Sequence, residues 1–142
     1  MNALDALCDT FERLDAGNLA ELDAYYARDA WFKDPFHEVT GAAAIRAILK
    51  HTFDKLPGAR FRVTRRFPGT DEHAVILWEM DFVMPVTRQP TTISGATHLT
   101  FDATGKVARH RDYWDAAEEL YARLPLLKWL MRALARKAAA PL

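Results

Sequence analysis

Residues Gly105–Asp115, GKVARHRDYWD, constrain both the fold and the chemistry of this chain more than any other stretch. Period-two alternation in this run is typical of a β-strand whose successive side chains point to opposite faces of a sheet. His110, Asp112 and Trp114 therefore share one face. Because an imidazole and a carboxylate are costly to bury without a partner or a purpose, this face indicates a strand that lines a functional cavity.

The rest of the chain changes its hydrophobic period once. Apolar residues spaced three and four apart predict helices over about 4–14, 18–26 and 40–56, the last two capped by Asn18 and Thr40. A short extended piece is expected at 30–33. From residue 59 the period becomes two, which predicts strands near 59–68, 73–84, 91–102 and 105–115. Helices followed by hairpin-linked strands predict an α+β fold with a curved antiparallel sheet packed on the N-terminal helices.

The C-terminal residues predict an additional amphipathic helix. Asp115 is its expected N-cap, and the apolar stripe continues past Pro125 to Leu134. The other side of this helix is basic, with Lys128, Arg132, Arg136 and Lys137. A helix of this kind can lie on a membrane surface, but we expect it to pack on its own domain or on a second subunit. The chain is thus interpreted as one domain, 1–142, with a helical extension over 115–138.

Composition excludes several classes of protein. The 19 basic and 19 acidic residues balance to a formal net charge of zero, which argues against nucleic acid as a partner because phosphate binding needs a basic face. Cys8 is the single cysteine, and no CxxC or HExxH pattern is present, so no dedicated metal site is predicted. The start of the chain has no signal-peptide pattern, and no apolar run reaches membrane length. We therefore expect a soluble cytoplasmic protein.

Short motifs in a fixed order carry a resemblance to a known family. They are LDAGN at 14–18, YARDA at 26–30, DPF at 34–36, AIR at 44–46, FDATGKV at 101–107 and YW at 113–114. Together they resemble the SnoaL-like, NTF2-like superfamily, which includes ketosteroid isomerases, polyketide cyclases and limonene epoxide hydrolases. The resemblance extends to Asp115. It implies a cone-shaped, strongly bent sheet around a long helix, a deep pocket, and a homodimer formed through the outer sheet face.

The resemblance also implies candidate catalytic residues. By position, Asp34 matches the aspartate that acts as general base in ketosteroid isomerases. Thr10 and Thr97 stand where those enzymes have the tyrosine and the protonated aspartate of their oxyanion hole. A threonine hydroxyl is a weaker donor, so steroid isomerisation is disfavoured. On the last strand, Asp112 resembles in role the acid/base aspartate of polyketide cyclases.

Each candidate also has a structural explanation. An aspartate before a proline, such as Asp34, often accepts backbone N–H groups in a turn. Asp112 can pair with His110 or with an arginine of a neighbouring strand, and His110 can be a hydrogen-bonded core residue. Large side chains either line a hollow cone that selects a flat, apolar ligand or fill the cone themselves: Trp78, Met80, Phe82 and Trp114.

The first hypothesis is a small cofactor-independent enzyme of the isomerase or cyclase type. Asp34 would remove a proton from an apolar carbonyl or polycyclic molecule, and Asp112, assisted by His110, would return it or hold a developing enol. Thr10, Thr97 and the large side chains of the cone would bind the substrate. The alternatives are a non-catalytic dimer that binds an apolar small molecule in the same pocket, and an interaction module that uses the outer sheet face or the tail helix.

Overall fold

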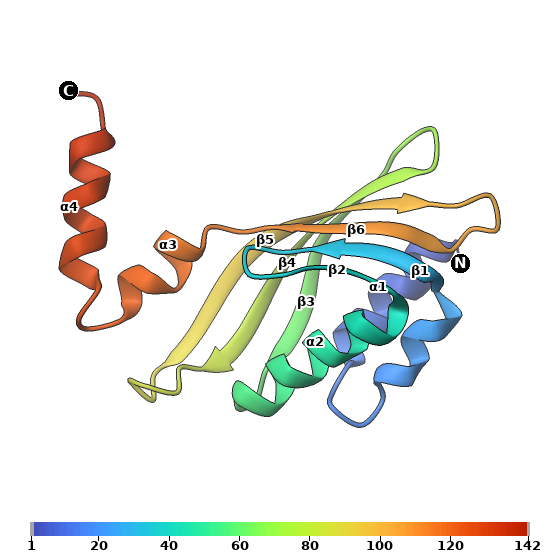
Figure 1. Ribbon diagram of the computed structural model, residues 1–142, viewed down its shortest axis with the longest axis horizontal. Coiled ribbons are helices and arrows are strands. Elements are labelled where there is room, and N and C mark those ends of the chain that lie inside the picture. The colour runs from blue at the N-terminus through green and yellow to red at the C-terminus, as the bar shows by residue number, and fades with distance from the viewer. Residues whose placement is uncertain (1, 142) are drawn as a thin grey trace.

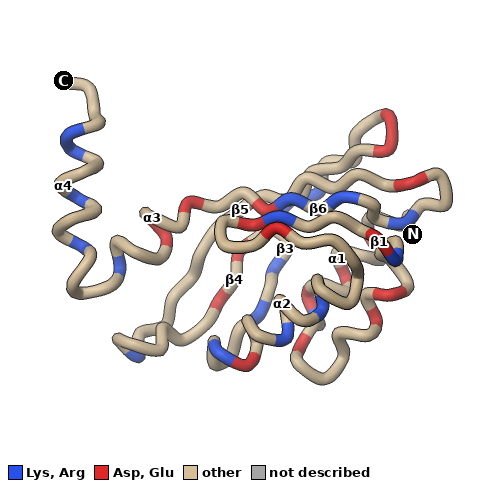
Figure 2. The backbone as a smooth tube through the Cα atoms, viewed as in Figure 1, with Lys and Arg blue, Asp and Glu red and all other residues tan. Residues whose placement is uncertain are grey.

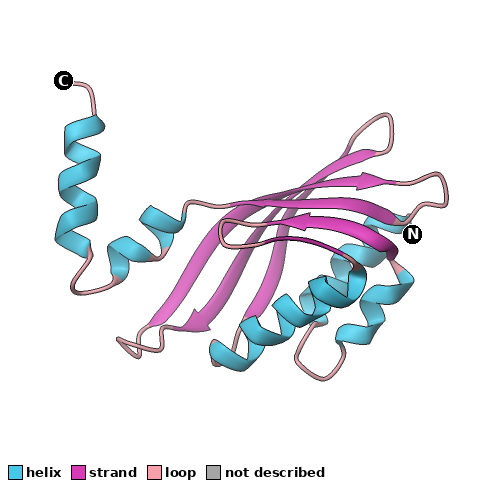
Figure 3. Cartoon of the chain, in the orientation of Figure 1, coloured by secondary structure: helices cyan, strands magenta, loops and turns pink. Residues whose placement is uncertain are grey.

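The computed structural model describes residues 2–141 and contains one curved sheet with helices α1 and α2 packed on one of its faces (Figures 1 and 3). A helical tail, formed by the residues after β6, extends beyond one end of the sheet. The elements in chain order are α1 Ala3–Arg13, the 3-10 helix η1 Leu19–Ala24, β1 Tyr26–Lys33, β2 Glu38–Thr40, α2 Ala42–Lys55, β3 Arg60–Pro68, β4 His73–Val83, β5 Pro90–Phe101, β6 Val107–Tyr113, α3 Ala116–Glu119, the 3-10 helix η2 Tyr121–Arg123 and α4 Lys128–Ala138.

The sheet is mixed, which corrects the prediction of an antiparallel sheet. Its strand order is β2-β1-β6-β5-β4-β3, and every neighbouring pair is antiparallel except β1 and β6. In that parallel pair Phe32 lies beside His110 and Lys33 beside Arg111. The sequence predicted only a short extended piece at 30–33, whereas β1 begins at Tyr26. The α+β class and the four strand segments after residue 59 are confirmed.

The core lies between α1 and the inner face of the sheet. On α1, Leu7 and Cys8 are completely buried, as the predicted stripe requires. On β4 and its end, each second residue from Ala74 to Met84 is at most 6% exposed. This continuous apolar face is the expected signature of a strand that is buried on one side.

Neither predicted cap residue caps a helix through its side chain, although Asn18 does occupy the N-cap position of η1. The Asn18 side chain caps no helix; it accepts a hydrogen bond from Asp15 N and donates one to Arg13 O, so it stabilises the turn after α1. Thr40 is the last residue of β2, and Gly41 occupies the cap position of α2. Gly41 has a φ of 113°, a conformation that favours glycine, and this allows the chain to turn from β2 directly into α2.

The basic run on β3 divides between the two faces of the sheet. Arg62 lies on the outer face and bonds to Glu79 and Asp81 of β4 at 2.6 and 2.8 Å. A register shift between Val63 and Arg65 then alters the alternation. As a result Arg66 lies on the inner side and bonds to Asp5 and Asp9 of α1.

The helical tail is broken, whereas the sequence predicted one helix that continues past Pro125. Asp115 does cap α3, since its side chain accepts a hydrogen bond from Glu118 N. The chain then passes through η2, and α4 begins only after Pro125, which has no N–H to continue a helix. In Figure 1, α4 stands clear of the sheet. Among residues 2–141, no helix is both long and apolar enough to cross a lipid bilayer.

Cys8 gives a testable measure of how tightly α1 packs. Burial raises the pKa of its thiol from 9.0 to about 11. Because the folded state holds the proton more tightly than the unfolded state, the free energy of unfolding should fall by about 2 kcal/mol as the pH rises from 9.0 to about 11. Urea titrations across this range measure the slope. The variant Cys8→Ala should show a smaller slope, and an equal slope in both proteins would contradict the assignment.

Candidate active site

Four neighbouring strands bring their inner side chains to one point in the sheet. Thr97 of β5 lies directly opposite Asp112 of β6, and the adjacent pair is Leu99 with His110. On the other side of β5, Trp78 of β4 reaches Thr97, and on the other side of β6, Tyr26 of β1 reaches His110. The order of strands in the sheet therefore assembles a row of polar groups within the apolar core.

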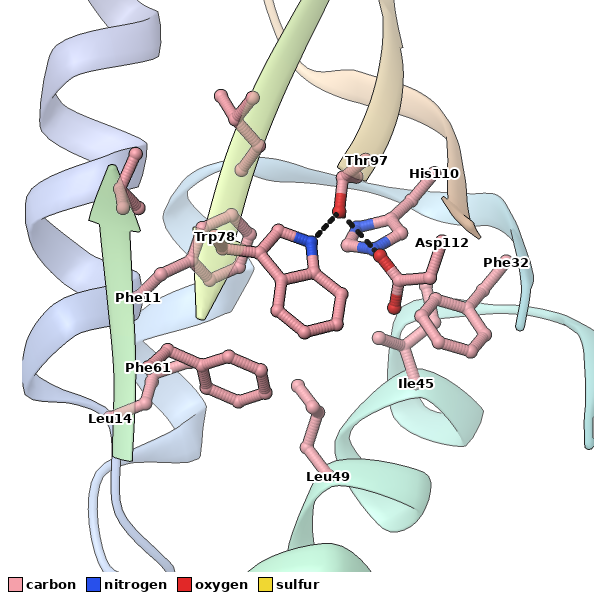
Figure 4. Close-up of a pocket in the computed structure, with 12 residues that line it drawn as sticks. Phe11, Leu14, Phe32, Ile45, Leu49, Phe61, Trp78, Thr97, His110 and Asp112 are labelled. Atoms are coloured by element: carbon pink, nitrogen blue, oxygen red, sulfur yellow. Dashed lines mark hydrogen bonds and ion pairs between the residues drawn. The ribbon is translucent and has the colours of Figure 1, made fainter. Parts of the chain in front are cut away.

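Two hydrogen-bond chains converge on one oxygen of Asp112, and Figure 4 shows the one that passes through Thr97. In the first, Trp78 Nε1 donates to Thr97 Oγ1 at 2.8 Å, and Thr97 Oγ1 donates to Asp112 Oδ1 at 2.5 Å. In the second, Tyr26 OH lies 2.6 Å from His110 Nδ1, and His110 Nε2 lies 2.7 Å from Asp112 Oδ1. The network fixes the position of the Asp112 carboxylate from two sides.

The environment of Tyr26 bears on which groups donate in the Tyr26–His110–Asp112 hydrogen-bond chain. Burial, followed by the nearby charge of Asp112, holds the pKa of the Tyr26 phenol well above its ordinary value. The phenol therefore keeps its proton and can donate it to His110 Nδ1. In the tautomer that carries its proton on Nε2, His110 accepts at Nδ1 and donates to Asp112 Oδ1, so both ring nitrogens have a partner.

The second oxygen of Asp112 faces an apolar cavity. Among residues 2–141 no hydrogen bond reaches Oδ2, and in Figure 4 the free oxygen points away from Thr97 and His110. The inner part of the cavity has a volume of about 40 Å³. Apart from the polar groups above, its walls are apolar side chains: Phe11, Leu14, Phe32, Ile45, Leu49, Phe61, Val63 and Ile76.

A larger outer cavity adjoins the inner one and contains Asp34. Its volume is about 410 Å³, and it shares Phe32, Leu49, Phe61, Trp78 and Asp112 with the inner cavity. Polar side chains also line it, including Asp34, His37, His51 and Lys55. The two carboxylates thus open into the same space, which is large enough for a bicyclic or polycyclic molecule.

Asp34 is held by its own turn. Its Oδ1 accepts hydrogen bonds from the backbone N–H groups of Phe36 and His37, at 2.8 and 2.6 Å. The ring nitrogen Nδ1 of His37 lies 3.0 Å from the same oxygen. The structural explanation of the Asp-Pro pair therefore holds, while the side chain, 14% exposed, still lines the outer cavity.

Comparison with known proteins places the chain in a family. A SnoaL-like domain model matches residues 8–110, which is most of the chain. The chain belongs to the SnoaL-like domain family. No curated protein matches the sequence of this SnoaL-like domain.

Solved structures share the fold of this SnoaL-like domain at low sequence identity. A protein with a ketosteroid isomerase-like fold from Catenulispora acidiphila DSM 44928, solved with trimethylamine, is 17% identical, with a TM-score of 0.70 over 83% of this chain and 88% of that one. An NTF2-like protein from Exiguobacterium sp. 255-15 is 18% identical, with a TM-score of 0.67 over 80% and 98%. A protein of the SnoaL-like family from Agrobacterium tumefaciens str. C58 is 16% identical, with a TM-score of 0.64 over 80% and 94%. These likenesses bear on the fold.

The site brings together eight of the nine residues singled out in the sequence. His110, Asp112 and Trp114 share one face, and Thr97 lies beside Asp112. Asp34, Trp78, Met80, Phe82 and Trp114 line the outer cavity, which those large side chains leave open. Thr10 is completely buried but lines neither cavity. Its hydroxyl donates to Ala6 O and accepts from Arg13, so both of its bonds lie within α1 and not in the site.

The role of Tyr26 in the hydrogen-bond network is not predicted from the sequence. The sequence predicts Tyr26 at the end of a helix, whereas it is the first residue of β1. Alternation backwards from Phe32 through Ala30 places Tyr26 on the inner face, but it also places the exposed Arg28 there. A register shift between Tyr26 and Trp31 accounts for this mismatch, and for this reason the alternation does not reveal that Tyr26 faces inward.

Among the described residues, no group of three or more His, Cys, Asp or Glu is arranged to hold a metal ion.

Proposed function

We propose that this SnoaL-like protein is a small, cofactor-independent enzyme that moves a proton on an apolar carbonyl or polycyclic molecule. One observation carries the proposal. The Asp112 carboxylate presents a free Oδ2 to an apolar cavity, while two converging donor chains hold its Oδ1 in place. A positioned carboxylate in an apolar pocket is the usual arrangement for a general base.

The geometry favours different roles for the two carboxylates from those expected from the sequence. Asp112 accepts the α-proton of the substrate on Oδ2, and the electron pair of the broken C–H bond moves into the enolate. Asp34, whose Oδ1 is already engaged in its turn, is the second acid/base group of the outer cavity. His37, His51 and Lys55 line that cavity and supply N–H donors for the enolate oxygen.

Deuterium exchange tests the proposal without knowledge of the natural substrate. The probe is 2-tetralone, an enolisable apolar bicyclic ketone, incubated with the protein in D2O and followed by proton NMR. We expect loss of the α-proton signal faster than in buffer or in an equal concentration of serum albumin. Exchange no faster than in these controls, for 2-tetralone and a panel of similar ketones, would overturn the enzyme proposal.

Tyr26→Phe tests the relay behind Asp112. Removal of the hydroxyl leaves the buried His110 Nδ1 without its hydrogen-bond partner, which should cost about 1–3 kcal/mol of stability and lower the exchange rate about tenfold. Urea unfolding and the NMR exchange assay measure the two effects. The matched control is Tyr25→Phe, which removes a hydroxyl from the neighbouring residue and should leave both values near wild type. Equal behaviour of the two variants would contradict a role for Tyr26.

The alternative function is non-catalytic binding of an apolar small molecule in the same cavity. The observation in its favour is that Asp34 and one oxygen of Asp112 already have partners within the chain, as in a structural network. Binding of 2-tetralone without exchange, detected as quenching of tryptophan fluorescence, would favour this function. Trp78 and Trp114 line the cavity and supply the signal.

A homodimer through the outer sheet face belongs to the same proposal. Apolar side chains on that face are partly exposed, notably Val75, Leu77 and Tyr113. A second copy of the chain would cover them. Light scattering at several concentrations measures the mass, and a monomer at all concentrations would contradict this arrangement.

A further inference from the structure

Helix α4 exposes apolar side chains that nothing in the domain covers. Leu126, just before the helix, is 84% exposed, and Trp129 and Leu134 are 67% and 53% exposed. Leu130 lies one turn before Leu134 and shares its face. The helix follows η2 after a turn and stands clear of the sheet (Figure 1), so this surface is available to a partner.

The same helix carries charge of one sign only. Every charged side chain after Glu119 is basic, and four of the five lie on α4: Lys128, Arg132, Arg136 and Lys137. Figure 2 shows this separation, with blue along α4 and the acidic residues confined to the rest of the chain. Residues 1–119 hold all 19 of the acids and 14 of the 19 bases. A balanced protein is thus divided into an acidic body and a basic, partly apolar helix.

The outer sheet face of a second copy is a poor partner for this helix. Arg109 and Arg111 project from β6 on that face, and Arg62 projects from β3. The acids closest to Arg62 are Glu79 and Asp81, and both are already bonded to it. A helix with four bases gains little from a surface where Glu79 and Asp81 are already paired and where Arg109 and Arg111 add positive charge.

We propose that α4 docks on an anionic membrane surface. Leu126, Leu130 and Leu134 would enter the boundary between headgroups and acyl chains, while the basic residues contact lipid phosphates. An amphipathic helix with a basic polar face is the type that lies in the membrane interface, and tryptophan is enriched at that depth. The proposal does not depend on the function of the cavity.

Sedimentation with vesicles tests this inference on the full chain. The vesicles are phosphatidylcholine alone, or phosphatidylcholine and the anionic lipid phosphatidylglycerol at a ratio of about 7:3. We expect binding to the anionic vesicles only, with a marked loss in high salt, because salt screens the charges. Binding to both kinds of vesicle equally, or to neither, would overturn the proposal.

Two tail variants and one control locate the binding surface. Because each basic residue near an anionic surface strengthens binding about fivefold, Arg132→Gln, Arg136→Gln and Lys137→Gln together should weaken it about a hundredfold. Leu130→Gln with Leu134→Gln should weaken it at least tenfold. The control replaces three exposed arginines of the body with glutamine: Arg28, Arg60 and Arg88.

The control should bind within about twofold of wild type, because its substitutions lie outside α4. Loss of binding in the control but not in the tail variants would overturn the assignment to α4. A dimer that the tail variants disrupt, in a protein that binds no vesicles, would show instead that a second copy covers the helix.

Discussion

Asp112→Asn is expected to lower the rate of deuterium exchange into 2-tetralone at least a hundredfold. General-base catalysis by a positioned group contributes about 10² to 10⁴ in rate, and an amide cannot accept the α-proton. Asparagine can still accept the hydrogen bonds of Thr97 and His110 through its side-chain oxygen, so the fold should persist. Initial exchange rates by NMR and far-UV circular dichroism of both proteins measure the two expectations.

Asp34→Asn distinguishes the role of Asp34 from that of Asp112. Its oxygen can still accept the backbone N–H groups of Phe36 and His37, so the turn is preserved. We expect a smaller loss of rate than for Asp112→Asn. The surface variant Asp29→Asn should have no effect on exchange. A large loss in Asp34→Asn with normal exchange in Asp112→Asn would reverse the assignment of the base.

Gly95→Ala should displace the Trp78 indole and thereby disturb the site. Gly95 lies opposite Trp78 in the β4–β5 pair, and a Cβ at this position would lie 2.6 Å from Trp78 Cη2 and 2.9 Å from Cε2. The indole must move, and it is the first donor of the chain that ends at Asp112. Overpacking of this kind costs about 1–3 kcal/mol. Urea unfolding measures the loss of stability, and the exchange assay should show a parallel loss of rate.

The matched control for this substitution is Ser94→Ala. Ser94 is the preceding residue of β5 and is exposed, so its truncation should change the free energy of unfolding by less than about 0.5 kcal/mol. If Gly95→Ala were as stable and as active as Ser94→Ala, then the position of the Trp78 ring would not matter to the site.

Periodicity predicted the parts of the fold that depend on local pattern. The alternation of residues 74–84 specified which face of β4 is buried, and the alternation of residues 105–115 placed His110, Asp112 and Trp114 together. These predictions succeeded because one face of each strand packs on a continuous core. A shift of one residue would have moved every apolar side chain to the solvent.

The features that sequence analysis missed depend on partners far away in the chain. Nothing near Tyr26 indicates that β1 pairs in parallel with β6, and therefore nothing indicates that its hydroxyl meets His110. The register shifts in β1 and β3 could not be predicted for the same reason. A shift is defined by the pairing of a strand with its neighbour, and the sequence of one strand does not specify that pairing. The sequence does contain a signal for the break before α4, because Pro125 cannot continue a helix. The apolar stripe on both sides of this proline nevertheless favoured one continuous helix.

The pairing of β1 with β6 also determines when this protein can finish folding. Tyr26 and His110 are 84 residues apart, so the seam between them closes only after the chain has been synthesised to the end of β6. Long-range pairing of this kind slows folding, because the entropic cost of closing a large loop comes before the favourable contacts can form. Until that step, β1 and β5 each have an unpaired edge, to which a strand of another nascent chain can add. The pocket therefore cannot be complete before β6 is in place between β1 and β5, and refolding at high concentration places this step in competition with aggregation.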